Sequence, residues 1–377
     1  MILKALFERI PAVLCQGSWD TDIASIAMCS KEVTNNSLFI CIKGMEQDGH
    51  QYIQEAAERG AAACLVEEAF WKKSASVHGN LKQPEKKTSA YGELKPPEQM
   101  TIVSVQNTRE AAAWAAAAFY RYPSKELKVI GITGTKGKTS TTFMIRDILE
   151  AAGYKTGLLG TIDYEIGEEK KRAERTTPEA IDIQRYLRKM ADSGCRFAVM
   201  EVSSQGLKLH RSDGILFDVG VFTNLGRDHI GPNEHKDFED YKRCKAMLFQ
   251  QCKLGIANID DPYYADIFRG ATCKVETFGF SPKADLRAEN VNLVSKPGYL
   301  GVSYHVAGKA DFDVEIDIPG KFSVYNSLTA IAVCRHFGVP SEKITEALKT
   351  AHVKGRIEMI KVSDDFTLMI DYAHNAM

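Results

Sequence analysis

The chain has 377 residues, with 48 Lys and Arg against 49 Asp and Glu, and 44% of its residues are hydrophobic. At roughly 150 residues per domain, this length and composition predict a globular protein of two or three domains. The balanced charge lacks the large basic excess that non-specific binding to nucleic acid or to an anionic membrane requires. We therefore expect neither nucleic acid nor a membrane as a partner.

The N-terminus and the apolar stretches indicate a cytoplasmic protein. The opening segment MILKALFERIPAVLCQG lacks a signal-peptide core followed by a cleavage site. The apolar stretches are far shorter than the ~20 residues of a transmembrane helix. The 9 cysteines are scattered and never spaced as C-x-x-C, which favours neither a disulfide framework nor a zinc ribbon.

Short apolar runs and helical patterns alternate at the start of the chain and predict a small α/β domain at residues 1–106. Strands are expected at 38–42, 63–66 and 100–105, and a helix at 52–59. Residues 72–99 are rich in Lys, Ser, Gln, Glu and Pro, which indicates a solvated loop or a partly disordered insertion.

A helix capped by Asn107 or Thr108 and stopped by Pro123 opens a central domain at residues 107–354. Further strands are expected at 127–133, 198–202, 219–223, 255–258 and 274–278. Their alternation with helical segments predicts a mostly parallel sheet covered by helices. Consecutive alternating strands within 285–318 break this rhythm and predict a small antiparallel appendage.

The chain closes on residues 355–377, where LMIDYAH indicates a strand that delivers Asp371 into a loop. A natural domain seldom stops directly after such a strand. We therefore expect a fragment in which a third domain has only begun.

Residues 129–142 read VIGITGTKGKTSTT, a buried strand followed by a glycine-rich turn and the start of a helix. Glycines allow backbone N–H groups to approach phosphate oxygens, Lys138 can reach the terminal phosphates, and Thr139 can ligate Mg²⁺. The spacing departs from the common G-x-x-x-x-G-K-[ST], because Ile132 occupies its first glycine position. A surface Gly/Lys turn is the alternative, but the strand before and the helix after favour a polyphosphate site.

Two apolar strands downstream end in polar side chains. The strand in FAVMEVSSQGLKLHR carries Glu201, and the strand in FDVGVFTNLGRDH carries Asn224, Asp228 and His229. Ligands bind at the carboxyl ends of strands in open α/β sheets. A carboxylate and an imidazole beside a phosphate loop suit a hard cation, although His229 alone would be read as an ordinary loop histidine.

Six ordered motifs resemble those of the Mur ligases, ATP-dependent enzymes that add amino acids to the UDP-N-acetylmuramoyl peptide precursor of peptidoglycan. They are GITGTKGKTS, MEVSS with FTNLGRDH, YKRCKAMLF, GKFSVYNSLTAIA, GRIEMI and IDYAH. Within the family the chain is most similar to the tripeptide synthetases, which add the third residue. The resemblance implies an N-terminal UDP-sugar-binding domain, a central P-loop ATP-binding domain and a truncated Rossmann-like C-terminal ligase domain.

The resemblance also implies roles for individual positions. The ATP phosphates would bind Gly134, Thr135, Lys136, Gly137, Lys138, Thr139 and Ser140. Asn326 would lie near the adenine, Arg356 near the phosphates and Asp371 near the ribose. The Mg²⁺ ligands would be Thr139, Glu201, His229 and Lys245, the last as a carbamate derived from CO₂. The catalytic set would be Lys138, Glu201, His229 and Lys245, and the UDP-sugar peptide would contact Ser30, Thr176, Thr177, Ser203 and Arg211.

Three features depart from the family pattern. Lys136 stands where the family usually has Asn, Gln205 replaces the histidine of Ser-Ser-His, and the segment HIGPNEHKDFED is longer than in well-known tripeptide synthetases. By propensity alone, Thr177 would be a helix cap before Pro178. Lys245 would likewise be a solvated lysine of an amphipathic stretch.

These features predict two-step amide formation by a monomeric ATP-dependent ligase. The terminal carboxylate of UDP-N-acetylmuramoyl-dipeptide would attack the γ-phosphate of ATP, and an amino acid would then displace phosphate from the acyl phosphate. The amino acid stays open between meso-diaminopimelate, L-lysine and others. Alternatives are a cyanophycin or folylpolyglutamate synthetase of the same fold, a P-loop GTPase, and a non-catalytic binding protein derived from a ligase.

Overall fold

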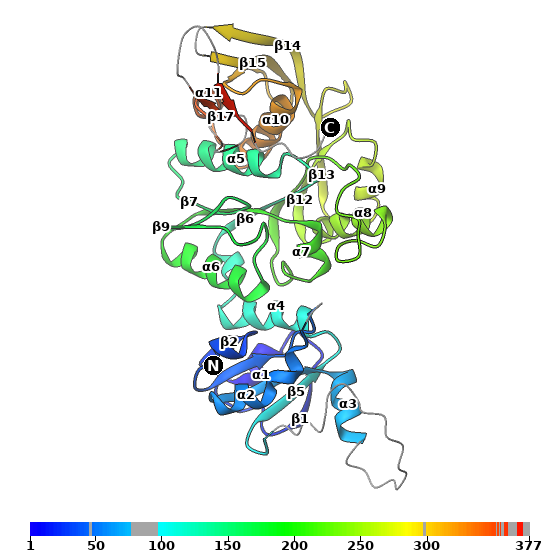
Figure 1. Cartoon of the computed structure of the whole chain (residues 1–377). Coiled ribbons are helices and arrows are strands. Elements are labelled where there is room, and N and C mark those ends of the chain that lie inside the picture. The colour runs from blue at the N-terminus through cyan, green and yellow to red at the C-terminus, as the bar shows by residue number, and fades with distance from the viewer. Residues whose placement is uncertain are drawn as a thin grey trace. The chain divides into compact units, whose positions relative to one another are not determined.

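The computed structural model describes residues 1–44, 47–76, 97–296, 299–351, 353, 355, 358–360 and 368–371. Its contacts divide the chain into two compact units (Figure 1). Unit 1 comprises Met1–Pro123, Glu179–Arg185 and Leu209–Gly214, and unit 2 comprises Ser124–Pro178, Tyr186–Lys208 and Ile215–Met377. The domain limits 1–106, 107–354 and 355–377 stay a prediction. No helix among the described residues combines the length and the apolar composition needed to cross a bilayer.

Unit 1 contains a five-stranded sheet with helices on both faces. Its strands are β1 (Val13–Gln16), β2 (Ser25–Ala27), β3 (Ser37–Ile40), β4 (Ala61–Glu67) and β5 (Thr101–Val105), in the spatial order β1-β5-β4-β3-β2. Its helices are α1 (Leu3–Leu6), α2 (Ile53–Glu58), α3 (Glu68–Ser76) and α4 (Thr108–Phe119), with 3₁₀ turns η1 (Ser30–Glu32) and η2 (Gly49–Tyr52). Only β1 runs antiparallel to its neighbour.

Alternate residues of the unit 1 strands face opposite layers, as the period of two in a strand requires. Leu38 and Leu65 pack with α1 and the alanine-rich face of α4. Phe39 and Cys64 pack with α2 on the other face. Because both faces are buried, the strands read as continuous apolar runs.

Unit 2 is built on an eleven-stranded sheet in the order β16-β15-β14-β13-β12-β11-β6-β10-β7-β8-β9. Its strands are β6 (Lys128–Thr133), β7 (Thr156–Leu159), β8 (Asp163–Ile166), β9 (Glu169–Arg172), β10 (Phe197–Glu201), β11 (Phe217–Phe222), β12 (Cys252–Asn258), β13 (Lys274–Gly279), β14 (Leu286–Lys296), β15 (Tyr299–Gly308) and β16 (Phe312–Ile316). Two more strands, β17 (Glu358–Ile360) and β18 (Leu368–Ile370), form a separate antiparallel pair.

The unit 2 helices are α5 (Lys138–Ala151), α7 (Ser204–Lys208), α8 (Phe238–Ala246), α9 (Tyr264–Phe268), α10 (Lys321–His336) and α11 (Ser341–Lys349), with η3 (Pro123–Lys125) and η4 (Met247–Gln250). Helix α6 (Ala180–Asp192) is shared, since its residues up to Arg185 count with unit 1. Helices α5, α10 and α11 bury apolar side chains of β6 and β10 to β12 in one core. Helices α7 and α8 lie on the other side of the sheet (Figure 1).

The parallel part of the unit 2 sheet confirms the predicted architecture. Strands β14, β13, β12, β11, β6, β10 and β7 are parallel in that order. The strands predicted within 285–318 are antiparallel to one another, as expected, and they extend the edge of the central sheet. Leu286 of β14 pairs with Phe278 of β13, so the central sheet continues into them. The hairpin β8–β9 was not predicted, because it is short and largely polar.

Two sequence expectations about helix ends were wrong. Helix α3 continues to Ser76, into the segment expected as a solvated loop, because Phe70 is buried against the sheet. Residues 77–96 of that segment lie outside the described residues. Helix α4 is capped by Asn107, as expected, but it ends at Phe119 and not at Pro123. Arg121 and Tyr122 turn the chain there with positive φ angles of 61° and 51°.

Candidate active site

The phosphate loop joins the end of β6 to the start of α5. Strand β6 is buried after Lys128, because β10 and β11 pair with it on both sides. Gly134 and Gly137 then adopt φ angles of 155° and 82°. A side chain at Gly134 would collide with the Thr223 hydroxyl, and one at Gly137 would collide with the Asn326 amide. Both positions therefore require glycine.

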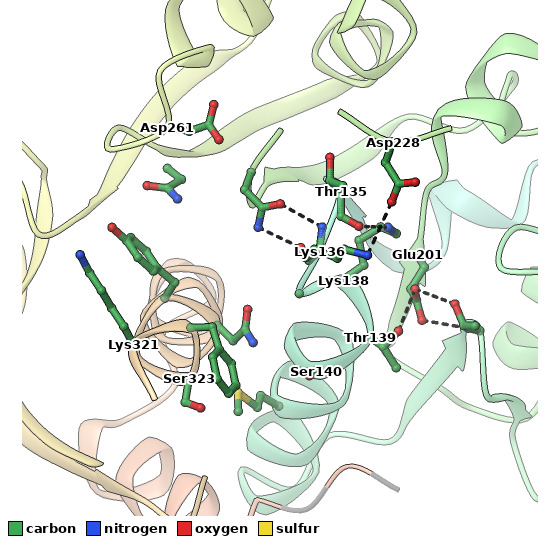
Figure 2. Close-up of a pocket in the computed structure, with 18 of the residues that line it drawn as sticks. Thr135, Lys136, Lys138, Thr139, Ser140, Glu201, Asp228, Asp261, Lys321 and Ser323 are labelled. Atoms are coloured by element: carbon green, nitrogen blue, oxygen red, sulfur yellow. Dashed lines mark hydrogen bonds and ion pairs between the residues drawn. The ribbon is translucent and has the colours of Figure 1, made fainter. Parts of the chain in front are cut away.

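The end of β11 holds the backbone of the loop. The Thr135 N–H donates to the Asn224 carbonyl, and the Lys136 N–H donates to Asn224 Oδ1, both at 2.9 Å. The Thr223 hydroxyl and the Asn224 amide donate in turn to the Lys136 carbonyl, at 2.7 and 3.1 Å. The Lys136 ammonium lies 3.5 Å from the Asp228 carboxylate (Figure 2). The loop therefore carries a second cation beside Lys138.

Lys138 begins α5 and Lys245 lies near the end of α8, yet both amines donate to the Gly134 carbonyl, at 2.8 and 2.9 Å. The Lys245 side chain is 1% exposed, and its Nζ lies 4.4 Å from the centre of the Tyr241 ring. Burial, followed by the charge of Lys138, lowers the pKa of Lys245 well below its ordinary value. The expectation of a solvated Lys245 was wrong, because the loop and the ring cover it.

Glu201 ends β10, beside the phosphate loop, and is 1% exposed. Its Oε2 accepts from the Thr139 and Thr161 hydroxyls, at 3.2 and 3.0 Å, and its Oε1 accepts from the Thr161 N–H at 2.8 Å (Figure 2). These donors are neutral, so no side-chain cation among the described residues balances the charge of this carboxylate. A buried carboxylate beside a threonine hydroxyl suits a hard divalent cation.

His229 lies in the loop after β11, at a φ angle of 55°, and its side chain is 49% exposed. Its Nδ1 lies 2.9 Å from Glu234 Oε1. A carboxylate at Nδ1 favours the tautomer in which Nε2 carries the lone pair. His229 therefore presents Nε2 as a nitrogen ligand.

One pocket of about 750 Å³ gathers most of the predicted nucleotide and metal residues. The predicted residues that line it are Thr135, Lys136, Gly137, Lys138, Thr139, Ser140, Thr176, Glu201, His229, Asn326 and Asp371. Gly134 contributes its carbonyl to the two lysines. Arg356 lies outside the described residues.

Lys245 and Ser203 line a smaller cavity, which shares Lys138 and His229 with the large pocket. Thr177 lines neither. Its hydroxyl donates to the Glu201 carbonyl and accepts from the Ser203 N–H, both at 3.0 Å. The interpretation of Thr177 as a helix cap was wrong, since α6 begins at Ala180 and the hydroxyl ties down the end of β10.

The last two predicted substrate residues belong to unit 1. The Ser30 hydroxyl, at the start of η1, donates to Glu55 at 2.9 Å. The Arg211 guanidinium is 2.8 Å from Glu179, and Arg211 is 8% exposed. Both side chains are held in fixed positions by a carboxylate.

Sequence reasoning missed the far wall of the large pocket, formed by residues such as Asp260, Lys321 and Tyr325. The Tyr325 hydroxyl donates to Asp260 at 3.0 Å, and the Tyr325 ring packs on Phe280 at 4.9 Å between ring centres. The Lys321 ammonium lies 4.8 Å from the centre of the Phe280 ring. A signal was available for Asp260, because the segment Ile259-Asp260-Asp261 directly follows the buried strand β12. Lys321 and Tyr325 lie in the motif GKFSVYNSLTAIA, of which only Asn326 was given a role.

Comparisons with known proteins agree with this geometry. A model described as Mur ligase family, catalytic domain, matches residues 22–120, and a model of the Mur ligase middle domain matches residues 132–334. The UDP-N-acetylmuramoyl-L-alanyl-D-glutamate–2,6-diaminopimelate ligase 1 of Clostridium acetobutylicum is 38% identical over 377 residues, 99% of this chain and 72% of that protein. A ligase of the same kind from Bacillus licheniformis is 37% identical over 383 residues, with the same coverage.

Solved structures show the same fold. A UDP-N-acetylmuramoyl-L-alanyl-D-glutamate–2,6-diaminopimelate ligase superposes with a TM-score of 0.77 and 21% identity, over 99% of this chain and 71% of that one. The MurF ligase of Thermotoga maritima in complex with ADP superposes with a TM-score of 0.54 and 18% identity, over 89% and 68% of the two chains. The phosphate loop, the strand-end carboxylate and these matches together show that the chain belongs to the Mur ligase family.

Proposed function

We propose that the protein is an ATP-dependent ligase that forms an amide bond between UDP-N-acetylmuramoyl-dipeptide and an amino acid, in peptidoglycan synthesis. The observation that carries the proposal is the position of Lys138 and Thr139 beside the buried Glu201 in one pocket of about 750 Å³. This volume lies in the range of small-molecule sites. The names of the relatives support the reaction and the precursor.

ATP is assigned to the large pocket. Its phosphates bind the loop from Gly134 to Ser140. Hydrogen bonds to Thr223 and Asn224, at the end of β11, fix the backbone of this loop. Asn326, 7% exposed, and Asp371 line the same pocket and are assigned to the adenine and the ribose. Arg356 is assigned to the phosphates on the family resemblance alone.

The residues fit a magnesium ion. Thr139, Glu201 and His229 line one pocket and offer two oxygen ligands and one nitrogen ligand. Mg²⁺ would neutralise charge on the phosphates during phosphoryl transfer. A carbamate on Lys245 is proposed as a further oxygen ligand.

The environment of Lys245 favours carbamate formation. An ordinary lysine has a pKa near 10.4 and is a cation at neutral pH, which does not react with CO₂. Burial lowers the pKa of Lys245, and this increases the fraction of neutral amine. In the modified side chain a carboxylate-like group replaces the buried amine. The negative charge of this group would lie near the Lys138 ammonium.

The side chains act mainly by positioning and by electrostatics. Lys138 stabilises the charge that develops on the γ-phosphate as the peptide carboxylate attacks it. An acyl phosphate forms and ADP leaves. The amine of the amino acid then attacks the acyl carbon, and inorganic phosphate departs. No side-chain nucleophile is required.

The UDP-sugar peptide is assigned to Ser30, Thr176, Thr177, Ser203 and Arg211. The relatives are named as diaminopimelate ligases, so meso-diaminopimelate is the first amino acid to test and L-lysine the second. A cytoplasmic monomer, with neither nucleic acid nor a membrane as partner, completes the proposal, because ATP and the nucleotide precursor are cytoplasmic compounds.

Isothermal titration with Mg-ATP and with UDP-N-acetylmuramoyl-L-alanyl-D-glutamate, together with phosphate release in the presence of each amino acid, tests the proposal. We expect both ligands to bind, and any phosphate release to require all three substrates. Binding of GTP in preference to ATP, or no binding of the UDP precursor, would contradict the proposal.

A further inference from the structure

A second cavity of about 50 Å³ lies next to the large pocket. Its walls are Lys138, Ser203, Ser204, Gln205, His229, Glu234, His235 and Lys245. A water molecule occupies about 30 Å³ in the liquid, so the cavity accepts one or two waters or a group of about three heavy atoms. The buried Lys245 amine is therefore beside a space of the size of CO₂.

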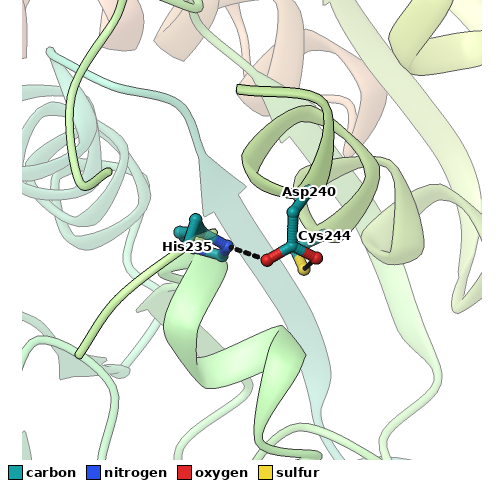
Figure 3. Close-up of side chains that lie close together, drawn as sticks. All are labelled: His235, Asp240 and Cys244. Atoms are coloured by element: carbon teal, nitrogen blue, oxygen red, sulfur yellow. Dashed lines mark hydrogen bonds and ion pairs between the residues drawn. The ribbon is translucent and has the colours of Figure 1, made fainter. Parts of the chain in front are cut away.

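A buried hydrogen-bond chain fixes one wall of this cavity. His235 Nε2 lies 2.9 Å from the Ser204 hydroxyl. On the other side of the ring, His235 Nδ1 lies 3.1 Å from Asp240, the contact drawn in Figure 3. All three residues are at most 4% exposed. Because Asp240 accepts the proton of Nδ1, Nε2 accepts the proton of the Ser204 hydroxyl. The hydroxyl proton of Ser204 is thus not available to a group in the cavity.

The cluster of His235, Asp240 and Cys244 has the composition of a metal site, but its contacts argue against one (Figure 3). The two oxygens of Asp240 already accept from the Lys208 ammonium at 2.8 Å and the Arg243 guanidinium at 2.6 Å. A metal ion would have to displace these cations. The cluster therefore holds His235 and Ser204 in place.

Gln205, next to Ser204 in α7, differs from its neighbours. Its Oε1 is buried and has no hydrogen-bond partner among the described residues. Buried polar atoms nearly always have a partner, so this amide at the cavity wall is available to pair with a group held in the cavity. The amide can turn by 180° to present its N–H₂ group, since the two ends have the same shape.

We propose that the small cavity receives the carboxylate group of a carbamate on Lys245, and that Gln205 donates a hydrogen bond to one of its oxygens. The inference rests on the carbamate assigned under the proposed function. Gln205 is a positioning residue for the carbamate and takes the place of the histidine usual in the family. The only carboxylate among the cavity walls, Glu234, is paired with His229.

The chemical step balances without any other reactant. The lone pair of the neutral Lys245 amine attacks the carbon of CO₂, and an N–C bond forms. One pair of C–O π electrons moves to oxygen, and the nitrogen loses one proton to water. The product keeps one N–H, which can continue to donate to the Gly134 carbonyl, now accepting at 2.9 Å. Its two oxygens face Gln205 and the large pocket.

Carbon-13 NMR of the full chain with ¹³C-bicarbonate, Mg²⁺ and a non-hydrolysable ATP analogue tests the proposal. The carbamate resonance, absent in Lys245→Ala, is followed as CO₂ is raised. We expect Gln205→Leu to need about tenfold more CO₂ for half-occupancy, the effect of one hydrogen bond to a charged group. Gln250→Leu, an exposed glutamine at the end of η4, serves as the matched control and should match the wild type.

Each result separates this inference from the proposed function. A resonance in the wild type that is equally strong in Gln205→Leu would overturn the role of Gln205 and leave the ligase proposal intact. If the wild type shows no resonance at any CO₂ concentration, both the carbamate and this inference are wrong. The proposed ATP site does not depend on the carbamate and is tested separately by isothermal titration. If Gln205→Leu is unfolded by circular dichroism, Gln205→Asn, which withdraws the amide by one methylene, must show the same increase.

Discussion

The phosphate loop and the segment from His229 to Lys245 supply neighbouring walls of one site, but they are positioned by different physics. The loop is held by local features: a buried strand, two glycines at positive φ and a helix that starts with Lys138. The second segment is held by burial and by contacts between residues far apart in sequence. Lys245 reaches Gly134, 111 positions away, and His235 reaches Ser204, 31 positions away.

This difference separates two kinds of functional residue. Lys138 is exposed to a ligand because the loop geometry points it there, and a substitution should remove its charge with little effect on the fold. The pKa of Lys245 is lowered because the side chain is buried. The carboxylate of Asp240 is stabilised by hydrogen bonds from the Lys208 and Arg243 cations. Substitutions in the second region should therefore affect activity and stability together.

Lys138→Ala is expected to have the largest effect on catalysis. Removal of one preorganised charge from a phosphoryl-transfer site should lower kcat by about 10²- to 10³-fold. Affinity for the UDP precursor, measured by isothermal titration, should be unchanged, because the Lys138 amine is held by the Gly134 and Thr135 carbonyls of the phosphate loop, which is assigned to ATP. Lys236→Ala, at a lysine that is 78% exposed, is the control. An equal loss of precursor affinity in Lys138→Ala would assign the loop another role.

Lys245→Ala should also abolish most activity, and small carboxylates such as acetate or formate should partly restore it by replacing the carbamate oxygens. The same variant tests whether activity depends on a buried side chain in the segment from His229 to Lys245. Lys242→Ala, on the same helix but paired with Asp266 and Glu239, is the matched control and should remain active. Retention of activity in Lys245→Ala, with no added mass on Lys245 in the wild type, would refute the carbamate.

The sequence was sufficient for features that depend on neighbours in the chain. Glycines and a strand–helix boundary predicted the phosphate loop. Because parallel strands end at the same edge of a sheet, Glu201 and Asn224 were expected beside the loop, where they lie. The antiparallel strands after β13 were predicted as strands, but their continuity with the central sheet depends on the pairing of Phe278 with Leu286, which no local pattern encodes.

Burial of polar side chains could not be predicted in the same way. An amphipathic stretch normally exposes its lysines, and only the packing of Tyr241 and the loop shows that Lys245 is covered. The role of Thr177 was misread for the same reason, since its partner is the end of β10, 24 positions away. The far wall of the pocket combines the loop after β12 with α10, and sequence spacing does not show that these two segments lie close together.

Asp240→Asn is expected to have the largest effect on stability. Although burial opposes it, hydrogen bonds from Lys208, Arg243 and His235 hold the pKa of Asp240 well below its ordinary value. Loss of the buried charge should lower the free energy of unfolding by about 3 kcal/mol, because it leaves cations without their partner. Urea denaturation at pH 7 measures the difference.

The pH dependence of this difference follows from linkage. The pKa of Asp240 is lower in the folded state than the ordinary value near 3.9, so the unfolded state binds more protons when the pH falls below about 4. The stabilisation is complete above that pH and decreases as the pH falls toward the folded pKa. The gap between wild type and Asp240→Asn should therefore be constant from pH 7 to 5 and narrow below pH 4. A gap that widens in acid would contradict this assignment.

Asn107→Ala should have the smallest effect. It extends the comparison to a helix cap outside the site. The Asn107 side chain accepts from the Arg109 and Glu110 N–H groups, at 3.0 and 3.3 Å, and thus caps α4. Loss of an N-cap costs about 1 kcal/mol, which corresponds to roughly fivefold faster hydrogen exchange of these two amides.

Asn107 also lies 3.2 Å from His210 Nε2 through its amide nitrogen, and a second variant separates the two contacts. Asn107→Ser keeps an oxygen that can cap the helix but cannot reach His210. If the cap dominates, exchange in Asn107→Ser should resemble the wild type, because the local hydrogen bonds are restored. If Asn107→Ser exchanges as fast as Asn107→Ala, the contact with His210, 103 positions away, stabilises the helix start. In that case the stability of the α4 start would depend on a contact between residues far apart in sequence, as the burial of Lys245 does.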